Sequence, residues 1–161
     1  MTNIKVLAIS SAGGHWVQLQ RISPAWDGCK VIYATTRSEY FAEILKSSAN
    51  RNQTEPVFET FVAANRWQKI RLLIQLIQIL WIIVKHRPDF VVSTGAASGY
   101  FALRIGKLTG AKTIWLDSIA NSEELSLSGQ KVSKYADLYL TQWEHLANPD
   151  QGGPLFKGAV I

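Results

Sequence analysis

Two glycines and a histidine stand where the first apolar run of the chain ends, in the segment 10–15 (SSAGGH). Gly13 and Gly14 let the backbone turn sharply and approach a ligand closely. The N-terminus of a following helix would direct N–H groups and a positive dipole end toward phosphate. A neutral imidazole at His15 could accept a proton from a hydroxyl nucleophile. The same residues also fit a tight strand-to-helix turn that binds nothing, with His15 as a capping or core histidine.

Two further segments place small or acidic residues after apolar runs. The segment 94–100 (TGAASGY) carries Gly95, Ser98 and Gly99, which permit another close approach of the backbone, and Ser98 is expected to cap the next helix. Its other interpretation is plain packing of a helix on a sheet. Asp117 follows the run 112–116 and could bind a sugar hydroxyl, act as a base or cap a turn. Taken together, the loops favour a phosphate-rich ligand.

The familiar nucleotide-binding fingerprints are missing. The chain has neither GxxxxGK[ST] nor GxGxxG, and its second apolar run ends in 33–37 (YATTR) without the acidic residue that would hold a ribose. A nicotinamide dehydrogenase is therefore not expected. The single cysteine, Cys29, excludes a disulfide framework and any multi-cysteine metal site. We expect neither a cofactor nor a metal.

Short β-rich runs alternate with helical stretches along the chain. We predict strands at 4–10, 30–34, 57–62, 89–93, 112–116 and 137–141. Helices are predicted from about residue 16, from a Ser38 cap to about 46, from 65 or 66 to 86, up to 108, and at 128–135, with residues 47–56 as a loop. Strands that are apolar on both faces predict a parallel sheet covered on both sides, a Rossmann-like α/β fold in one domain, 1–161. Ligands of such sheets bind beyond the carboxyl ends of the strands.

The helix around residues 70–84 (IRLLIQLIQILWIIV) is unusually apolar. Its polar positions Gln68, Arg71, Gln75 and Gln78 form one narrow stripe. Fifteen residues span about 23 Å, less than the ~30 Å of a bilayer core. The helix could lie on a lipid surface or be sandwiched between the sheet and a neighbour. For lipid contact, basic and tryptophan side chains stand at suitable places: Trp67, Lys69, Arg71, Trp81, Lys85 and Arg87.

The overall charge also fits an anionic partner. Seventeen Lys and Arg against twelve Asp and Glu give a net charge of +5. Nucleic acid is not expected as that partner, because no recognition motif and no basic cluster interleaved with exposed aromatics is present.

With these residues assembled, the chain resembles the family of the membrane-anchoring subunit of the eukaryotic dolichol-diphosphate GlcNAc transferase. Bacterial members of PssD type serve exopolysaccharide and capsule synthesis. The set is also similar to the N-terminal half of the peptidoglycan GlcNAc transferase MurG, and the resemblance covers nearly the whole chain. It is carried by SSAGGHWVQL (10–19), RPDFVVSTGAASGYFAL (87–103), KTIWLDSIA (112–120), LSGQKVSKYADLYLTQW (127–143) and FKGAVI (156–161).

The resemblance implies half of a GT-B enzyme that holds a lipid-diphosphate acceptor and docks on the cytoplasmic face of the cell membrane. A separate small subunit would supply the UDP-sugar site, so that this chain alone is expected to be inactive. By position, Gly13, Gly14 and His15 match the family's first glycine loop. In the same way, Gly95, Ser98 and Gly99 match the second loop, and Asp117 stands where an acidic residue is usual.

The expected reaction is an inverting sugar transfer to a polyprenyl-diphosphate-linked saccharide, with His15 or Asp117 as base. Two other functions stay open: a non-catalytic scaffold that recruits a catalytic partner to the membrane, and a stand-alone domain for a small phosphorylated ligand. Eukaryotic members begin with a transmembrane anchor, whereas this sequence starts at the first strand, so membrane attachment is expected to rest on the apolar helix.

Overall fold

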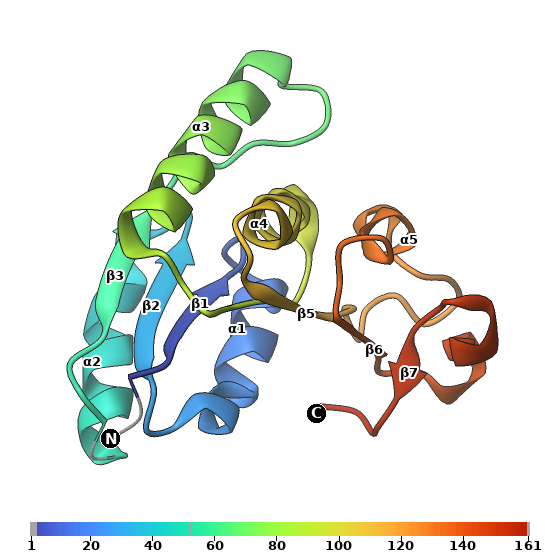
Figure 1. The fold of residues 1–161 in the computed structure, drawn as a ribbon, viewed down its shortest axis with the longest axis horizontal. Coiled ribbons are helices and arrows are strands. Elements are labelled where there is room, and N and C mark those ends of the chain that lie inside the picture. Colours follow the sequence, from blue (N-terminus) through green and yellow to red (C-terminus); the bar gives the residue numbers. More distant parts are fainter. Residues whose placement is uncertain (1–2, 52, 161) are drawn as a thin grey trace.

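A computed structural model describes residues 3–51 and 53–160, and it shows one parallel sheet in the order β3-β2-β1-β4-β5-β6-β7 (Figure 1). The chain winds outward from β1 to one edge and then returns to continue from β4 to the other. The crevice between β1 and β4 is therefore the point at which ligands of such sheets bind. The strands are β1 (Lys5–Ile9), β2 (Lys30–Thr35), β3 (Val57–Thr60), β4 (Phe90–Ser93), β5 (Lys112–Leu116), β6 (Leu138–Thr141) and β7 (Leu155–Phe156).

Helices cover both faces of the sheet, as the sequence predicted (Figure 1). They are α1 (Gly14–Arg21), α2 (Phe41–Asn50), α3 (Lys69–His86), α4 (Ala96–Leu108) and α5 (Leu127–Val132). Alternate strand residues face opposite ways, so two apolar clusters form. One joins residues such as Leu7 and Val91 to α3, α4 and α5, and the other joins Val6 and Val92 to α1 and α2.

The predicted elements differ from the observed ones mainly at their ends. Ser38 does not cap α2, because a short 3-10 turn at Ser38–Tyr40 precedes the helix and Tyr40 takes the N-cap position. Helix α2 also runs to Asn50, into the segment predicted as a loop. The edge strand β7 was not predicted, because two residues are too few to give a periodic pattern.

Candidate functional site

The first and second loops meet through His15, in the crevice between β1 and β4. The Nδ1 atom of His15 lies 3.0 Å from the Thr94 carbonyl oxygen, and Thr94 Oγ1 donates a 2.6 Å hydrogen bond to the His15 carbonyl. A carbonyl only accepts, so the ring must carry a proton on Nδ1 to make the first bond. In the neutral ring this leaves Nε2 as the acceptor, which is the arrangement that a general base needs. Thr94 was not predicted as a site residue, because it binds His15 Nδ1 through its backbone carbonyl oxygen, which no side-chain pattern reveals.

Gly95 is what allows the His15 ring to lie against the second loop. A Cβ atom on Gly95 would stand 2.4 Å from both Nδ1 and Cε1 of His15, and the backbone of Gly95 has φ +141°. Any side chain would therefore push the ring away and strain the backbone. The close approach predicted for this loop is real, but the group that approaches Gly95 is the imidazole.

Gly13 and Gly14 border open space. Both are exposed, and an added Cβ on either would meet no atom within 4 Å. Position 13 requires glycine because its φ is +89° at the turn into α1. The first turn of the adjacent helix contains no acidic residue, so no carboxylate of that turn neutralises its positive dipole end. This part of the predicted site has the room and the polarity that an anion requires.

Ser98 and Gly99 lie elsewhere than the sequence predicted. Both are buried in the first turn of α4, where Gly95 occupies the N-cap position and Ser98 caps nothing. A Cβ on Gly99 would stand 2.0 Å from Ser93 Oγ, so this glycine lets α4 pack closely on β4. The packing explanation is the one that the structure supports for these two residues.

Asp117 is enclosed at the start of α5. Only 2% of it is exposed, and its carboxylate accepts hydrogen bonds from Ser126 N (2.9 Å), Ser126 Oγ (2.6 Å) and Trp115 Nε1 (3.3 Å). The carboxylate is thereby engaged in fixing the 117–126 loop. The structure gives an acceptor hydroxyl no access to it, so the base role that we carry forward is that of His15.

Helix α3 turns polar side chains inward and apolar ones outward. Gln75 is 2% exposed and donates to the Val62 carbonyl, while Gln78 accepts from the Val62 N–H, each at 2.8 Å. These glutamines bind the chain segment that leaves β3, so half of the predicted polar stripe faces protein. Another face packs on the core through Ile79, Ile82 and Ile83. The outward stripe is 44–78% exposed and consists of Ile70, Leu73, Ile74, Ile77, Leu80, Trp81 and Val84.

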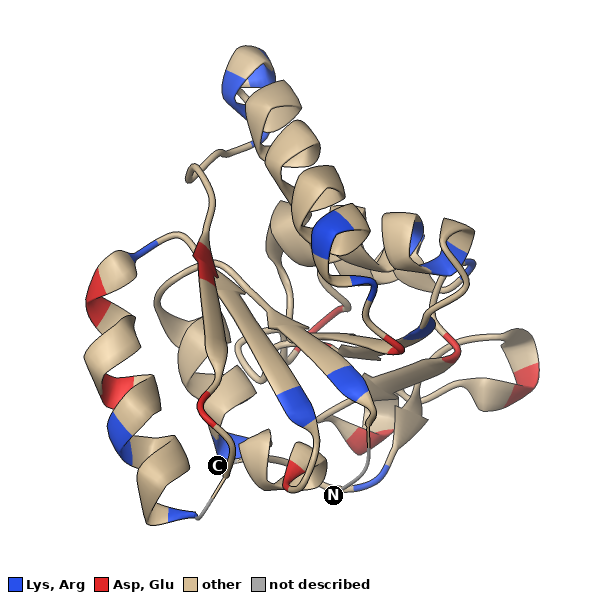
Figure 2. Ribbon diagram, turned by 60° about the vertical axis from the view of Figure 1, so that its left-hand side comes forward, with Lys and Arg blue, Asp and Glu red and all other residues tan. Residues whose placement is uncertain are grey.

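The positive charge of the chain is concentrated on and around α3. Between residues 60 and 88 there are five Lys and Arg and no Asp or Glu, whereas elsewhere twelve basic residues are matched by twelve acidic ones. Figure 2 shows these basic residues at the two ends of the projecting helix. The predicted contact residues are all exposed there: Trp67, Lys69, Arg71, Trp81, Lys85 and Arg87. In addition, Lys85 Nζ lies 4.4 Å from the centre of the Trp81 ring.

The C-terminal end of α3 is hydrogen-bonded to β3. Glu59 accepts hydrogen bonds from Lys85 Nζ (2.8 Å) and His86 Nε2 (2.7 Å). Burial alone would raise the pKa of Glu59, but these two hydrogen bonds hold it below its usual value. In the described part of the chain, every helix is too short or too polar to cross a bilayer.

The family whose description is "Oligosaccharide biosynthesis protein Alg14 like" matches residues 12–153, which include the His15 loop, α3 and the Asp117 loop. The chain belongs to the Alg14-like family. A curated relative, the UDP-N-acetylglucosamine transferase subunit ALG14 of Yarrowia lipolytica (strain CLIB 122 / E 150), is 23% identical over 165 residues, covering 91% of this chain and 76% of the relative. The resemblance stated from the sequence is confirmed, and so is the class of glycosyltransferase subunit.

Solved structures confirm the fold of this Alg14-like chain. MurG from Acinetobacter baumannii superposes with a TM-score of 0.73 at 10% identity, over 99% of this chain and 46% of MurG. A UDP-N-acetylglucosamine 2-epimerase from Rickettsia bellii gives 0.68 at 14% identity, over 98% of this chain and 45% of the epimerase. At such identities the likeness concerns the fold alone, and the chain spans less than half of either solved chain.

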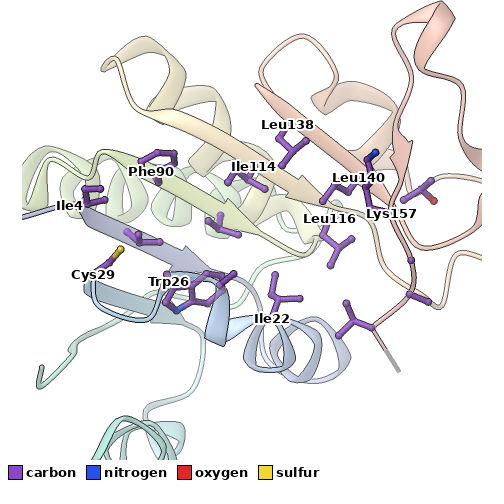
Figure 3. A pocket seen from close by; sticks show the side chains of 17 residues that line it. Ile4, Ile22, Trp26, Cys29, Phe90, Ile114, Leu116, Leu138, Leu140 and Lys157 are labelled. Carbon is purple, nitrogen blue, oxygen red and sulfur yellow. The ribbon is translucent and has the colours of Figure 1, made fainter. Parts of the chain in front are cut away.

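An apolar groove of about 540 Å³ lies on the face of the Alg14-like chain opposite α3 (Figure 3). Its floor is made by side chains of β4, β5 and β6 that point away from α4 and α5, among them Phe90, Ile114 and Leu138. One wall is formed by Ile22 and Trp26, and the other by the segment 157–160. Apart from Cys29, Thr141 and Lys157, the side chains that line it are aliphatic or aromatic. No pattern in the sequence indicates this groove, because each contributing strand is predicted simply as a buried strand.

Proposed function

We propose that this chain is the acceptor-binding subunit of an inverting glycosyltransferase that acts on a polyprenyl-diphosphate-linked saccharide. The donor would be a UDP-sugar, and UDP-N-acetylglucosamine is the first to test, because the Yarrowia lipolytica relative is named as a UDP-N-acetylglucosamine transferase subunit. The bacterial setting that we propose is exopolysaccharide or capsule synthesis, at the cytoplasmic face of the cell membrane.

The observation that carries the proposal is the pairing of His15 with the Thr94 carbonyl beside the open Gly13-Gly14 turn. In the proposed reaction the acceptor hydroxyl oxygen attacks the anomeric carbon of the donor while its proton passes to His15 Nε2. The bond from that carbon to the UDP oxygen breaks, and UDP leaves with inversion. The amides at the start of α1 would hold the acceptor diphosphate at a distance that keeps its saccharide near His15.

The outward stripe of α3 supports docking on lipid. An 18-residue helix is about 27 Å long, so it can lie along a bilayer surface with its apolar stripe in the acyl boundary. Lys85 is paired with Glu59, and the other four basic residues around the helix would then meet lipid phosphates, each contributing about 1 kcal/mol near an anionic surface.

The groove is the surface that we assign to the donor-binding subunit. It lies across the sheet from α3, so a chain docked on a bilayer through α3 would turn the groove away from lipid. It also lacks the convergent polar groups that orient a small ligand. An apolar segment of a second protein chain fits both facts.

The catalytic role is tested by His15→Ala in the chain co-purified with its donor-binding partner. Transfer of labelled sugar from UDP-N-acetylglucosamine to extractable lipid is measured on membranes. Loss of a general base should lower turnover by about 10²–10⁴-fold. His145→Ala is the matched control, since His145 is exposed and bonds only to the Ser122 carbonyl among the described residues. Near-normal turnover of the His15 variant would refute the base and favour a recruiting scaffold.

Docking is tested by flotation with vesicles that contain phosphatidylglycerol. Leu73→Glu places a carboxylate in the outward stripe, where Leu73 is 57% exposed. Burying one leucine is worth about 1.5–3 kcal/mol, so binding should fall by roughly tenfold or more. Leu108→Glu alters a leucine of α4 that is 80% exposed, and this variant should bind as the unaltered protein does. Equal binding by both variants would exclude α3 as the docking surface.

A further inference from the structure

Two buried glutamines connect the groove wall to the loops of the candidate site. Gln142, 2% exposed, follows β6 and accepts a 2.9 Å hydrogen bond from the Val160 N–H in the groove wall. Its Nε2 donates to the Asp117 carbonyl (2.9 Å) and to Gln18 Oε1 (2.8 Å). One side chain therefore holds three segments that are far apart in the sequence.

Gln18 continues the connection on α1, the helix that begins at Gly14. It is 5% exposed, its Nε2 donates to Ser118 Oγ at 3.1 Å, and its Oε1 also accepts from the Ile119 N–H at 3.3 Å. Gln18 lies one helical turn after His15, so a shift of its side chain is passed along a rigid helix to the His15 loop. The loop after β5 is fixed by the same atoms.

The outermost residue of this hydrogen-bond network, Val160, is part of the groove wall. Gly158, Ala159 and Val160 line the groove, and the Val160 carbonyl accepts a 3.4 Å hydrogen bond from Arg21 at the end of α1. A protein segment that fills the groove would pack on this wall and hold Val160 in place. Because Gln142 needs the Val160 N–H to satisfy its buried oxygen, holding Val160 also holds Gln142.

We propose that Gln142 and Gln18 are positioning residues that couple occupation of the groove to the geometry of the Gly13–His15 loop and the 117–119 loop. This inference rests on the proposed function for the meaning of the two sites, but the coupling itself is a property of this chain. Coupling between two sites is reciprocal. An anion bound at the first loop should therefore steady the groove wall, just as a partner in the groove should steady the loop.

The experiment uses the ¹⁵N-labelled chain and inorganic pyrophosphate as the probe. Val160→Pro removes the N–H that Gln142 accepts, whereas Val160→Ala keeps it and serves as the matched control. Gln142→Met removes the same bond with little change in volume, and it also removes the two bonds that Nε2 donates to the Asp117 carbonyl and to Gln18. Amide hydrogen exchange is followed at Ile119 and Val160, and pyrophosphate binding is followed through the amides of Gly13, Gly14 and His15.

We expect Val160→Pro to speed exchange at Ile119 by roughly two- to twelvefold, the range that one net hydrogen bond gives. Gln142→Met should speed it at least as much, because it removes that bond and two others. Both should weaken pyrophosphate binding. The double variant should behave as Gln142→Met does alone, because Gln142→Met already removes the bond that Val160→Pro breaks. In the unaltered chain, pyrophosphate should slow exchange at Val160, and this protection should vanish in Gln142→Met.

Unchanged exchange at Ile119 in Val160→Pro, or additive effects in the double variant, would overturn the coupling. If pyrophosphate fails to bind the unaltered chain at the first loop, the diphosphate seat of the proposed function fails instead. The exchange at Ile119 still decides the coupling in that case, since it is measured without a ligand.

Discussion

Gly95→Ala is the substitution whose cost can best be worked out from the structure. The backbone at Gly95 has φ +141°, and a side chain held in a disfavoured region costs about 1–3 kcal/mol. The new Cβ would also stand 2.4 Å from two atoms of the His15 ring. The ring must then leave the Thr94 carbonyl, and the lost hydrogen bond adds about 0.5–1.5 kcal/mol. We expect the free energy of unfolding to fall by about 1.5–4.5 kcal/mol.

Alanine substitutions at the two glycines of the first loop separate the cost of backbone strain from the cost of displacing the His15 ring. Gly13→Ala meets no atom within 4 Å but still takes a disfavoured positive φ, so it should show backbone strain of about 1–3 kcal/mol alone. Gly14→Ala meets neither obstacle and replaces a glycine at the first residue of α1. It should be neutral or stabilise the protein by about 0.4–1 kcal/mol.

The assay is urea unfolding followed by tryptophan fluorescence, with the chemical shift of the His15 ring as a local reading. The expected order of stability is Gly14→Ala, then Gly13→Ala, then Gly95→Ala, and only the last variant should move the His15 signal. If Gly95→Ala is no less stable than Gly13→Ala, or leaves that signal unchanged, the imidazole does not lie against the second loop and the account of the base is wrong.

Two further predictions concern Asp117 and Asp137, whose carboxylates form hydrogen bonds within the protein. Asp117→Asn keeps one oxygen but loses an acceptor for Ser126, so it should cost about 1.5–3 kcal/mol in urea unfolding and speed amide exchange around α5; unchanged stability would instead leave Asp117 free for chemistry. The hydrogen bond from Lys107 lowers the pKa of Asp137 to about 2 from an ordinary 3.8, even though partial burial opposes this. Its stabilisation is therefore complete above about pH 4 and is lost as the pH falls toward 2, so Asp137→Asn should flatten acid unfolding in that range, and an unaltered acid profile would contradict the pairing.

The strands and their loops could be predicted because each depends on local sequence. A run such as KTIWL is apolar on both faces wherever it is placed, and the parallel arrangement then brings the loops after β1, β4 and β5 to one edge. The sharp turn predicted at Gly13 and Gly14 is present for the same reason, since the positive φ of Gly13 belongs to the turn that leads into α1.

The features that the sequence did not predict depend on contacts between residues that no local sequence pattern reveals. Ser98 has the residue type of a helix cap, yet Gly95 takes that position and Ser98 is buried. Gln75 reads as part of a solvated stripe, yet its partner is the backbone of Val62, thirteen residues away. Gln18 and Gln142 lie 124 residues apart and show no motif at all. Side chains that bond across such separations are visible only once the chain is folded.

The uneven distribution of charge has a consequence for how the protein reaches a surface, as distinct from how firmly it stays there. A body that is neutral except along one projecting helix experiences a torque in the field of an anionic surface, which extends about 8–10 Å at physiological salt. The torque would turn α3 toward that surface before contact, so added salt should slow arrival and misorient it. Departure would instead be governed by the apolar stripe, which salt does not screen. Substitutions of the basic residues around α3 should therefore change mainly the rate of arrival at the surface, and substitutions in the apolar stripe mainly the rate of departure.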